Sequence, residues 1–324
     1  MKKCSVGGQA VMEGVMMRAP KGIALAVRKS DGTIVTDYKP HVSKAKKGTF
    51  LGLPIVRGVV SFVDSLVIGM QTLTDSAKIA GEDIFEEEPS KFEKWLSEKL
   101  GKSVETIVMG FAVIFAVALS VGLFFFLPTL ISSLVFGAEY AGPKIWRSLT
   151  EGGVRLIIFI GYILFCALIK DVRRVFMYHG AEHKTIACYE AEEDLTPENA
   201  KKHSRLHPRC GTNYMFLVMA ISILFFAAID FGNSFIVRFA TRLLFLPFVA
   251  GFSYEVLQFA AKHENIFTRI IRAPGMALQY ITTKEPTDDM IEVAIASFNL
   301  AMSSMEDDFT PPCCSTGNEE KKEA

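Results

Sequence analysis

The sequence predicts a mainly α-helical, polytopic membrane protein with about four transmembrane helices, a small N-terminal β-hairpin and interfacial amphipathic helices. Half of its 324 residues are hydrophobic, and its 26 phenylalanines crowd into long apolar runs. Lys and Arg together number 35, as do Asp and Glu, and no basic stripe with interleaved aromatic residues occurs. We therefore expect the lipid bilayer as a partner and no nucleic acid.

The first region, residues 1–104, is expected in the cytosol or at the membrane surface. Two short runs on either side of a turn around Gly32 predict a β-hairpin over 23–39, because glycine tolerates the positive φ of a tight turn. Upstream, the glycine-bounded segment 7–18 is mostly apolar, with Glu13 as its single acidic residue. Its pattern fits either a loop packed on a site with Glu13 inward or a strand with Glu13 in solvent.

Residues 54–80 predict an amphipathic helix that lies in the membrane interface or packs on the bundle. Four charged side chains interrupt its apolar run, and their burial in a bilayer would be costly. An acidic linker, 82–88, precedes a short amphipathic helix over 91–100, where Trp95 suits the headgroup level. This part of the chain is thus expected to lead into the first span without crossing the membrane.

Four apolar runs predict a membrane bundle over residues 105–261, and they cover 107–136, 154–169, 214–231 and 243–261. The first hundred residues and the 170–213 loop are rich in Lys and Arg, whereas the two other connections are short and hold two basic residues each. By the positive-inside rule, both termini and the 170–213 loop are cytosolic, and the protein is a multi-pass protein of the cell membrane.

Beyond the last span, residues 262–305 predict further cytosolic or interfacial helices. Residues 266–283 mix apolar and basic side chains, and a turn is expected at Pro274. Residues 288–304 place their apolar side chains on one side of a helix. The tail, 306–324, has the composition of a disordered segment.

A concentration of histidines in the 170–213 loop predicts a metal site. His179 and His183 are four residues apart, so on a helix both imidazoles leave the same face, with Glu182 close to them. This His-x-x-Glu-His spacing occurs in zinc hydrolases, where two ring nitrogens hold the ion and the carboxylate takes a proton from water. The alternative is a polar helix end whose histidines cap carbonyls or face solvent.

A second set of ligand-type side chains follows in the same loop. His203 and His207 are again four residues apart, and Pro208 is expected to end a helix near His207. Cys210 then lies in a turn from which its sulfur can approach an ion from another direction. The alternative is that Cys210 is a small buried residue and His207 a helix C-terminal cap.

Glu255 lies in the fourth predicted span, about 9 Å inside its cytosolic end at 1.5 Å rise per residue. An ionisable side chain at such a depth faces the bundle interior and has a partner. Glu255 is therefore either a further metal ligand, or an acceptor for a ligand histidine, or the partner of Lys262 or Arg269.

Together these motifs resemble the YqhQ-like family of bacterial membrane proteins, from about residue 5 to residue 305. The segments that carry the resemblance are 7–18, 179–185, 207–212, 253–255 and 292–296. Members of that family are described as predicted metal-dependent enzymes of unknown function. The resemblance implies a metal at His179, Glu182, His183, His207 and Cys210, without implying a substrate, and His203 is not part of its motif.

The first functional hypothesis is a hydrolase at the cytosolic face that depends on a divalent metal, zinc before iron. His179, His183 and either His207 or Cys210 would hold the ion. Glu182 would be the catalytic base, and Arg209 or Lys184 would stabilise an oxyanion. A site at the interface suits a lipid or a membrane peptide as substrate.

The alternative hypothesis is a non-enzymatic scaffold or assembly factor in which a structural metal ties the loop to the bundle. A closed four-ligand site would favour the scaffold and an open coordination position the enzyme. A third hypothesis is a membrane di-iron oxidase or hydroxylase, in which carboxylates would have to replace missing histidines.

Overall fold

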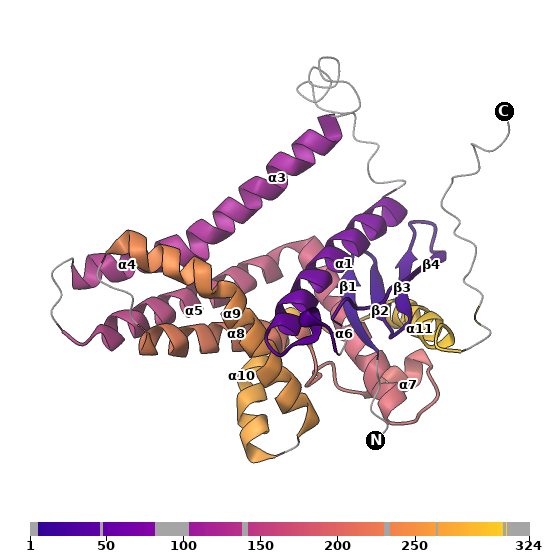
Figure 1. Cartoon of the computed structure of the whole chain (residues 1–324). Coiled ribbons are helices and arrows are strands. Elements are labelled where there is room, and N and C mark those ends of the chain that lie inside the picture. Colours follow the sequence, from indigo (N-terminus) through magenta and orange to yellow (C-terminus); the bar gives the residue numbers. More distant parts are fainter. Residues whose placement is uncertain are drawn as a thin grey trace.

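The computed structural model describes residues 6–45, 48–81, 104–137, 142–229, 234–263, 265–306 and 309. It confirms a mainly helical protein, and it shows that the N-terminal region forms a four-stranded antiparallel sheet. Long helices form an arm on one side of the molecule, and the sheet with its covering helices lies on the other side (Figure 1). The expected helix over 91–100 and the tail after residue 309 lie outside the described residues.

The sheet consists of two hairpins in the order β1-β2-β3-β4, and its strands are β1 (Gly7–Val11), β2 (Gly14–Arg18), β3 (Gly22–Arg28) and β4 (Ile34–Pro40). The hairpin predicted over 23–39 is confirmed as β3 and β4. Gly32 adopts a φ of 85° in its turn, as expected. The segment 7–18, for which the sequence left two alternatives, forms the other hairpin, and β1 is an edge strand.

Helices cover both faces of the sheet. Side chains alternate along each strand, so Val15, Met17 and Ala24 pack against α6 (Lys170–Glu190) and α11 (Asp288–Ser303). Val11 and Met16 point to the opposite face, where they meet Ile68 of α1 (Val56–Ala80). The sheet is therefore the middle layer between α1 and the pair formed by α6 and α11.

Within the described residues, five helices are long and apolar enough to cross a membrane, and they cover Val56–Ala80, Gly110–Phe136, Ile145–Leu168, Gly211–Ala228 and Phe235–Lys262. Four of them correspond to the predicted spans and form the helical arm. Their elements are α3 (Val104–Val121), α4 (Leu127–Phe136), α5 (Lys144–Leu168), α8 (Gly211–Ala228) and α9 (Phe235–Lys262). The protein is thus a multi-span membrane protein.

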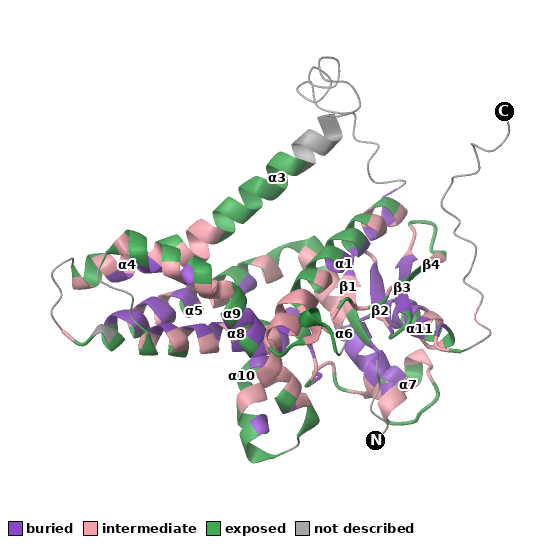
Figure 2. Cartoon of the chain, in the orientation of Figure 1, coloured by how far each residue is buried: buried purple, intermediate pink, exposed green. Residues whose placement is uncertain are grey.

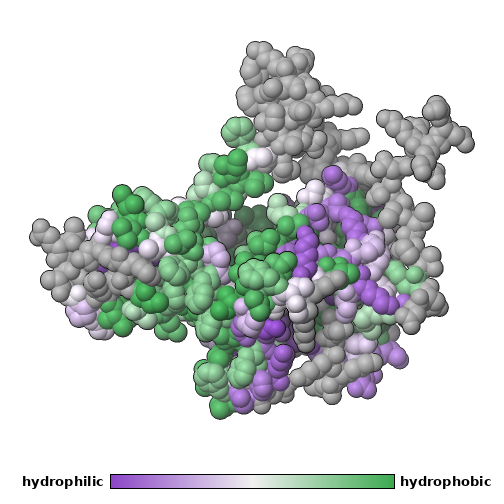
Figure 3. Space-filling view, viewed as in Figure 1, coloured by the Kyte–Doolittle hydropathy of each residue, from purple (hydrophilic) through white to green (hydrophobic). Residues whose placement is uncertain are grey.

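The surface of the arm matches this conclusion. Exposed residues cover α3 from Gly110 onward and the outer faces of its neighbours (Figure 2), and on the face shown in Figure 3 apolar residues gather over the same helices. A π-helical turn, Gly122–Phe126, separates α3 from α4, and Pro128 follows in the first turn of α4. The second span is longer than its predicted range 154–169, since α5 begins at Lys144.

The fifth candidate span is α1, which the sequence analysis assigned to the interface or to packing on the bundle. By length and hydropathy it qualifies as a span. In the structure it packs against the sheet and α9. Arg18 of β2 donates a hydrogen bond of 2.7 Å to Asp64 of α1, and a Cβ on Gly58 would come within 2.8 Å of the carbonyl oxygen of Gly251.

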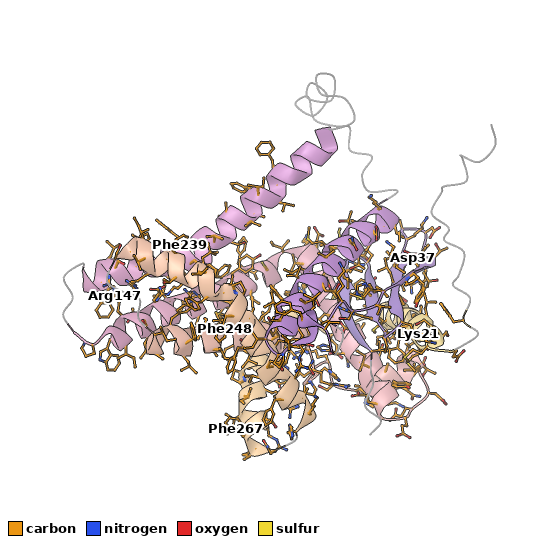
Figure 4. The ribbon with its side chains drawn as sticks, in the orientation of Figure 1. Lys21, Asp37, Arg147, Phe239, Phe248 and Phe267 are labelled. Atoms are coloured by element: carbon orange, nitrogen blue, oxygen red, sulfur yellow. The ribbon has the colours of Figure 1, made fainter. Side chains whose placement is uncertain are left out.

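The arm contains a buried cluster of charges that the sequence analysis did not predict. Glu151 of α5 is 1% exposed and contacts Arg155, Arg238 and Arg242, while Thr129 donates a hydrogen bond of 2.7 Å to it. Figure 4 shows Arg147, from the same helix, at the end of the arm that lies farthest from Asp37 of β4 and from Lys21 in the turn before β3. Mutual pairing is what allows such charges inside a membrane arm.

Two expectations about the C-terminal half are corrected. The 170–213 segment is mostly helical, because α6 runs to Glu190 and α7 covers Pro197–Lys202. The turn predicted at Pro274 is wrong, since α10 (Ile266–Thr282) continues through it. Gly275 is required there for close packing, because a Cβ would lie 2.4 Å from the side-chain oxygen of Asn213.

Candidate metal centre

Helix α6 places the two histidines of the His-x-x-Glu-His motif on one face, and backbone carbonyls orient both rings. Nδ1 of His179 lies 2.9 Å from the carbonyl oxygen of Thr282, and Nδ1 of His183 lies 2.6 Å from that of Arg205. A carbonyl oxygen only accepts hydrogen bonds, so each Nδ1 carries a proton, and in the neutral ring Nε2 is the nitrogen with the lone pair. Metal-binding histidines are oriented in this way.

Cys210 is brought to the same point by the start of α8. It is the N-cap residue of that helix, and its sulfur accepts a hydrogen bond from the backbone N–H of Thr212 at 3.4 Å. Its Sγ lies 3.2 Å from Nε2 of His179. One donor atom from each of His179, His183 and Cys210 lies within 4.8 Å of the others. Imidazole and thiolate donors together suit zinc.

Glu182 lies beside this group and is 4% exposed. Burial raises the pKa of its carboxyl group to about 7, although the neighbouring His179 and a hydrogen bond from the backbone N–H of Gly8 oppose that rise. Gly8 belongs to β1 and is in close contact, because a Cβ there would come within 2.8 Å of the carboxyl carbon. Among the described residues, Oε2 of Glu182 has no hydrogen-bond partner.

The three donor atoms and Glu182 line a single cavity of about 790 Å³. Its walls come from β1, from α1 through Ser65 and Ile68, from α6, and from the start of α8. A ligand in this cavity would therefore contact the donor group, the buried carboxylate and the sheet edge together.

His207 lines the cavity but is not one of the three grouped donors. Its Nε2 lies 3.4 Å from Glu190, which also pairs with Arg209, and its ring centroid is 5.6 Å from that of His183. Burial, followed by the nearby His183 and Arg209, lowers the pKa of His207 to about 4. Its backbone is held by Gln279, which bonds to its N–H at 2.8 Å and to its carbonyl at 2.9 Å.

The helical spacing predicted for His203 and His207 is wrong, because α7 ends at Lys202 and the chain to Cys210 is irregular. His203 instead lies 3.3 Å from Glu193. Lys184, proposed as an oxyanion partner, points to the connection after α7 and donates to the carbonyls of Lys201 and His203, each at 2.9 Å. Arg209 lines the cavity.

Among the described residues, Glu255 is not one of the grouped donors. It pairs with Arg57 of α1 at 2.7 Å and accepts a longer contact from the backbone N–H of Ile55 at 3.4 Å. This contact supports the ion-pair alternative, with Arg57 as the partner in place of Lys262 or Arg269, and the metal role stays a prediction. Glu13 pairs with Arg174 at 2.5 Å on the outer side of α6.

Several residues that shape the site were not found from the sequence. Gly8, Gln279 and the carbonyl groups of Thr282 and Arg205 act through contacts with residues far away in the chain. The sequence signal that could have pointed to Gly8 was the pair of glycines at the start of the 7–18 segment. A glycine often marks a position where another group comes close to the backbone.

The fold and the site together define a multi-span membrane protein with a buried histidine–cysteine group between its helical arm and its sheet. The chain belongs to the family described as "Protein of unknown function (DUF1385)", whose model matches residues 53–304. It is 33% identical over 297 residues to the uncharacterized protein YqhQ of Bacillus subtilis (strain 168). This alignment covers 90% of the present chain and 91% of YqhQ. The resemblance inferred from the motifs is confirmed. No solved structure matches the chain.

Proposed function

We propose that the protein is a metal-dependent hydrolase that acts on a membrane-associated substrate at the cytosolic face. One observation carries the proposal: three metal-type donors and a buried carboxylate line a single cavity of about 790 Å³. An ion with three protein ligands keeps a position for substrate or water, as in catalytic zinc sites.

The donor set favours zinc, with iron as the alternative. His179 and His183 offer neutral Nε2 atoms, because their Nδ1 protons are donated to carbonyls. Cys210 offers sulfur, which a zinc ion accepts readily together with imidazole. The di-iron hypothesis requires added carboxylate ligands, but Glu190 and Glu255 are both engaged by arginine side chains.

The residues around the donor group have separate roles in the proposed reaction. A divalent ion would supply a Lewis acid that polarises a carbonyl group and acidifies water. Glu182 takes the proton from water, since its carboxylate shares the cavity and Oε2 has no described hydrogen-bond partner. Arg209 lies on the cavity wall, where its charge favours a developing oxyanion.

The position of the cavity supports a membrane-associated substrate. Ser65 and Ile68 of α1 and Met215 of α8 line it, and both helices qualify as membrane spans. The loop charges support a cytosolic location for this side of the protein by the positive-inside rule. A substrate could therefore reach the donor group from the cytosolic membrane surface.

One observation favours the scaffold hypothesis as the second candidate. The ring of His207 is near enough to His183 that a changed rotamer would bring a fourth donor toward the group. Four protein ligands would close the site and make the metal structural. The present contact of His207 with Glu190 favours the open, catalytic arrangement.

Metal analysis of detergent-purified protein tests both candidates. We expect about one zinc per chain in wild type, Glu182→Gln and His207→Ala, and little in His183→Ala and Cys210→Ser. Loss of zinc in His207→Ala would favour the structural site. The metal-loaded wild type should hydrolyse phospholipid vesicles or unfolded labelled casein, while Glu182→Gln should retain the metal and lose the activity. Folded wild type without metal after zinc-replete growth would refute the proposal.

A further inference from the structure

The edge of the sheet forms one wall of the candidate metal centre. β1 is the first strand in the order β1-β2-β3-β4, and residues 6–10 all line the cavity. α1 borders this edge on one face of the sheet and α6 on the other, so the edge opens between them. The cavity thus contains both the donor group and the backbone of an edge strand.

The hairpin register determines which backbone groups of β1 point into the cavity. Val11 pairs with Gly14 across a two-residue turn, and such a closing pair is hydrogen-bonded. Alternation then directs the N–H and C=O groups of Gly8 and Ala10 away from β2. The hydrogen bond from the Gly8 N–H to Glu182 agrees with this register. No hydrogen bond from Ala10 across the outer edge is present among the described residues.

The side chains on this edge leave room for a second backbone. Gly7 and Gly8 are exposed and have no side chain, and Ala10 has only a methyl group. A Cβ placed on Gly7 would meet no atom within 4 Å. Outward N–H and C=O groups beside small residues are what an added β-strand requires.

We propose that the substrate is an extended peptide segment that pairs with β1 as a further strand and passes the donor group. The inference rests on the proposed hydrolase function and names the substrate class of that site. A peptide can pair with the N–H and C=O of Ala10 and with the C=O of Gly8, while the N–H of Gly8 stays with Glu182. A lipid has no repeat of N–H and C=O groups that could pair in this way.

The contact between Gly8 and Glu182 links this binding edge to the reaction. A strand paired at Gly8 runs alongside the Glu182 carboxylate and the group formed by His179, His183 and Cys210. The water oxygen bonds to the peptide carbonyl carbon, and the C–N bond breaks. Glu182 takes a proton from the water and passes it to the leaving amine nitrogen, so the products are a carboxylic acid and an amine.

Backbone-modified peptides test the inference on full-length protein. The probe is a fluorescein-labelled library of capped peptides of about eight residues with random side chains, long enough for one strand. Fluorescence polarisation measures its binding to zinc-loaded Glu182→Gln protein, which would bind peptide without cleaving it. We expect a library methylated at every backbone nitrogen to bind at least about tenfold more weakly, because it cannot donate to the edge. Equal binding of both libraries would overturn the inference.

A matched pair of variants tests the edge of the protein itself. Ala10→Pro removes the N–H that points away from β2, and the backbone hydrogen bonds between β1 and β2 are kept. Proline is tolerated at such positions of an edge strand. Ala10→Val retains the N–H and is the control. With equal zinc content, Ala10→Pro should bind the unmodified library about tenfold more weakly than Ala10→Val.

The outcomes separate this inference from the proposed function. Zinc-loaded protein that hydrolyses phosphatidylglycerol vesicles and does not bind the peptide library would overturn the peptide inference and leave the hydrolase standing. Equal binding by Ala10→Pro and Ala10→Val would also overturn it. Wild type that holds no zinc would refute the hydrolase and this inference with it.

Discussion

The carboxyl group of Glu182 and the backbone of Gly8 are in direct contact, with only 2.8 Å between its carboxyl carbon and a Cβ placed on Gly8. Gly8 also donates its N–H to the carboxylate. The first strand of the sheet and helix α6 therefore meet at the proposed catalytic base. This contact explains why a glycine-rich N-terminal segment and a histidine motif in the middle of the chain belong to one site.

Gly8→Ala should destabilise the protein. The new methyl group would lie 2.8 Å from both the Glu182 carboxyl group and the carbonyl oxygen of Met16, and such overpacking costs about 1–3 kcal/mol. Gly7→Ala is the matched control, because its Cβ meets nothing within 4 Å. Thermal unfolding in detergent measures both. Equal melting temperatures would show that Glu182 does not occupy this position.

The stability of chelator-treated protein should depend on pH through Glu182. Burial raises the pKa of its carboxyl group from an ordinary 4.5 to about 7, so the folded state binds this proton more tightly than the unfolded state. Stability is therefore lost as the pH rises from 4.5 to 7, by up to about 3 kcal/mol for a shift of about 2.5 units.

Glu182→Gln removes this titrating carboxyl group, and the glutamine side chain has nearly the same shape as glutamate. Relative to wild type, the variant should gain thermal stability above pH 7 and show little gain at pH 4.5. Melting curves of the two metal-free proteins at several pH values measure the difference. A gain that stays constant across this range would contradict a buried, titrating Glu182.

Gly180→Ala should disturb the packing of α6 against the segment that orients His179. A Cβ there would lie 2.1 Å from the carbonyl oxygen of Lys284, and this backbone cannot rotate away like a side chain. We expect a loss of about 1–3 kcal/mol and weaker zinc binding, because Thr282 holds the ring of His179 nearby. Gly161→Ala, whose Cβ meets nothing within 4 Å, is the control and should retain the wild-type zinc content.

Glu151→Gln should strongly destabilise the helical arm. The neutral side chain would leave the buried guanidinium groups of Arg155, Arg238 and Arg242 without their shared carboxylate. Breaking one side of a buried ion pair costs about 3–5 kcal/mol. Yield and melting temperature in detergent check this effect. The control is Glu292→Gln, whose exposed pair with Arg28 contributes less than about 1 kcal/mol. Similar losses in both variants would contradict the cluster.

Patterns within a few residues of each other predicted much of the fold and part of the site. Hydropathy located the four spans of the arm, because a bilayer requires long apolar helices. The spacing of His179 and His183 placed both imidazoles on one helix face, and α6 has that arrangement. The spacing of His203 and His207 failed, since Thr196 and Pro197 begin a short helix that ends before either histidine.

Contacts between distant residues were outside the reach of those patterns. Hydropathy alone did not distinguish an interfacial α1 from a membrane span. Two of the charged residues that argued against a span, Asp64 and Arg57, form ion pairs with the sheet and with α9. The depth of Glu255 predicted that it has a partner, but not which one. The choice of Arg57 depends on how α1 packs against α9.

The sequence by itself determined the class of protein, the family, the hairpin, the spans of the arm and the paired histidines on α6. Each of these depends on composition or on interactions between near neighbours, which local periodicity records. Only the tertiary structure decided that Cys210 joins those histidines, that Glu182 is buried against Gly8, and that an open strand edge lines the same cavity. These relationships arise when helices and strands pack, because the free energy of burial depends on elements that are far apart in the chain.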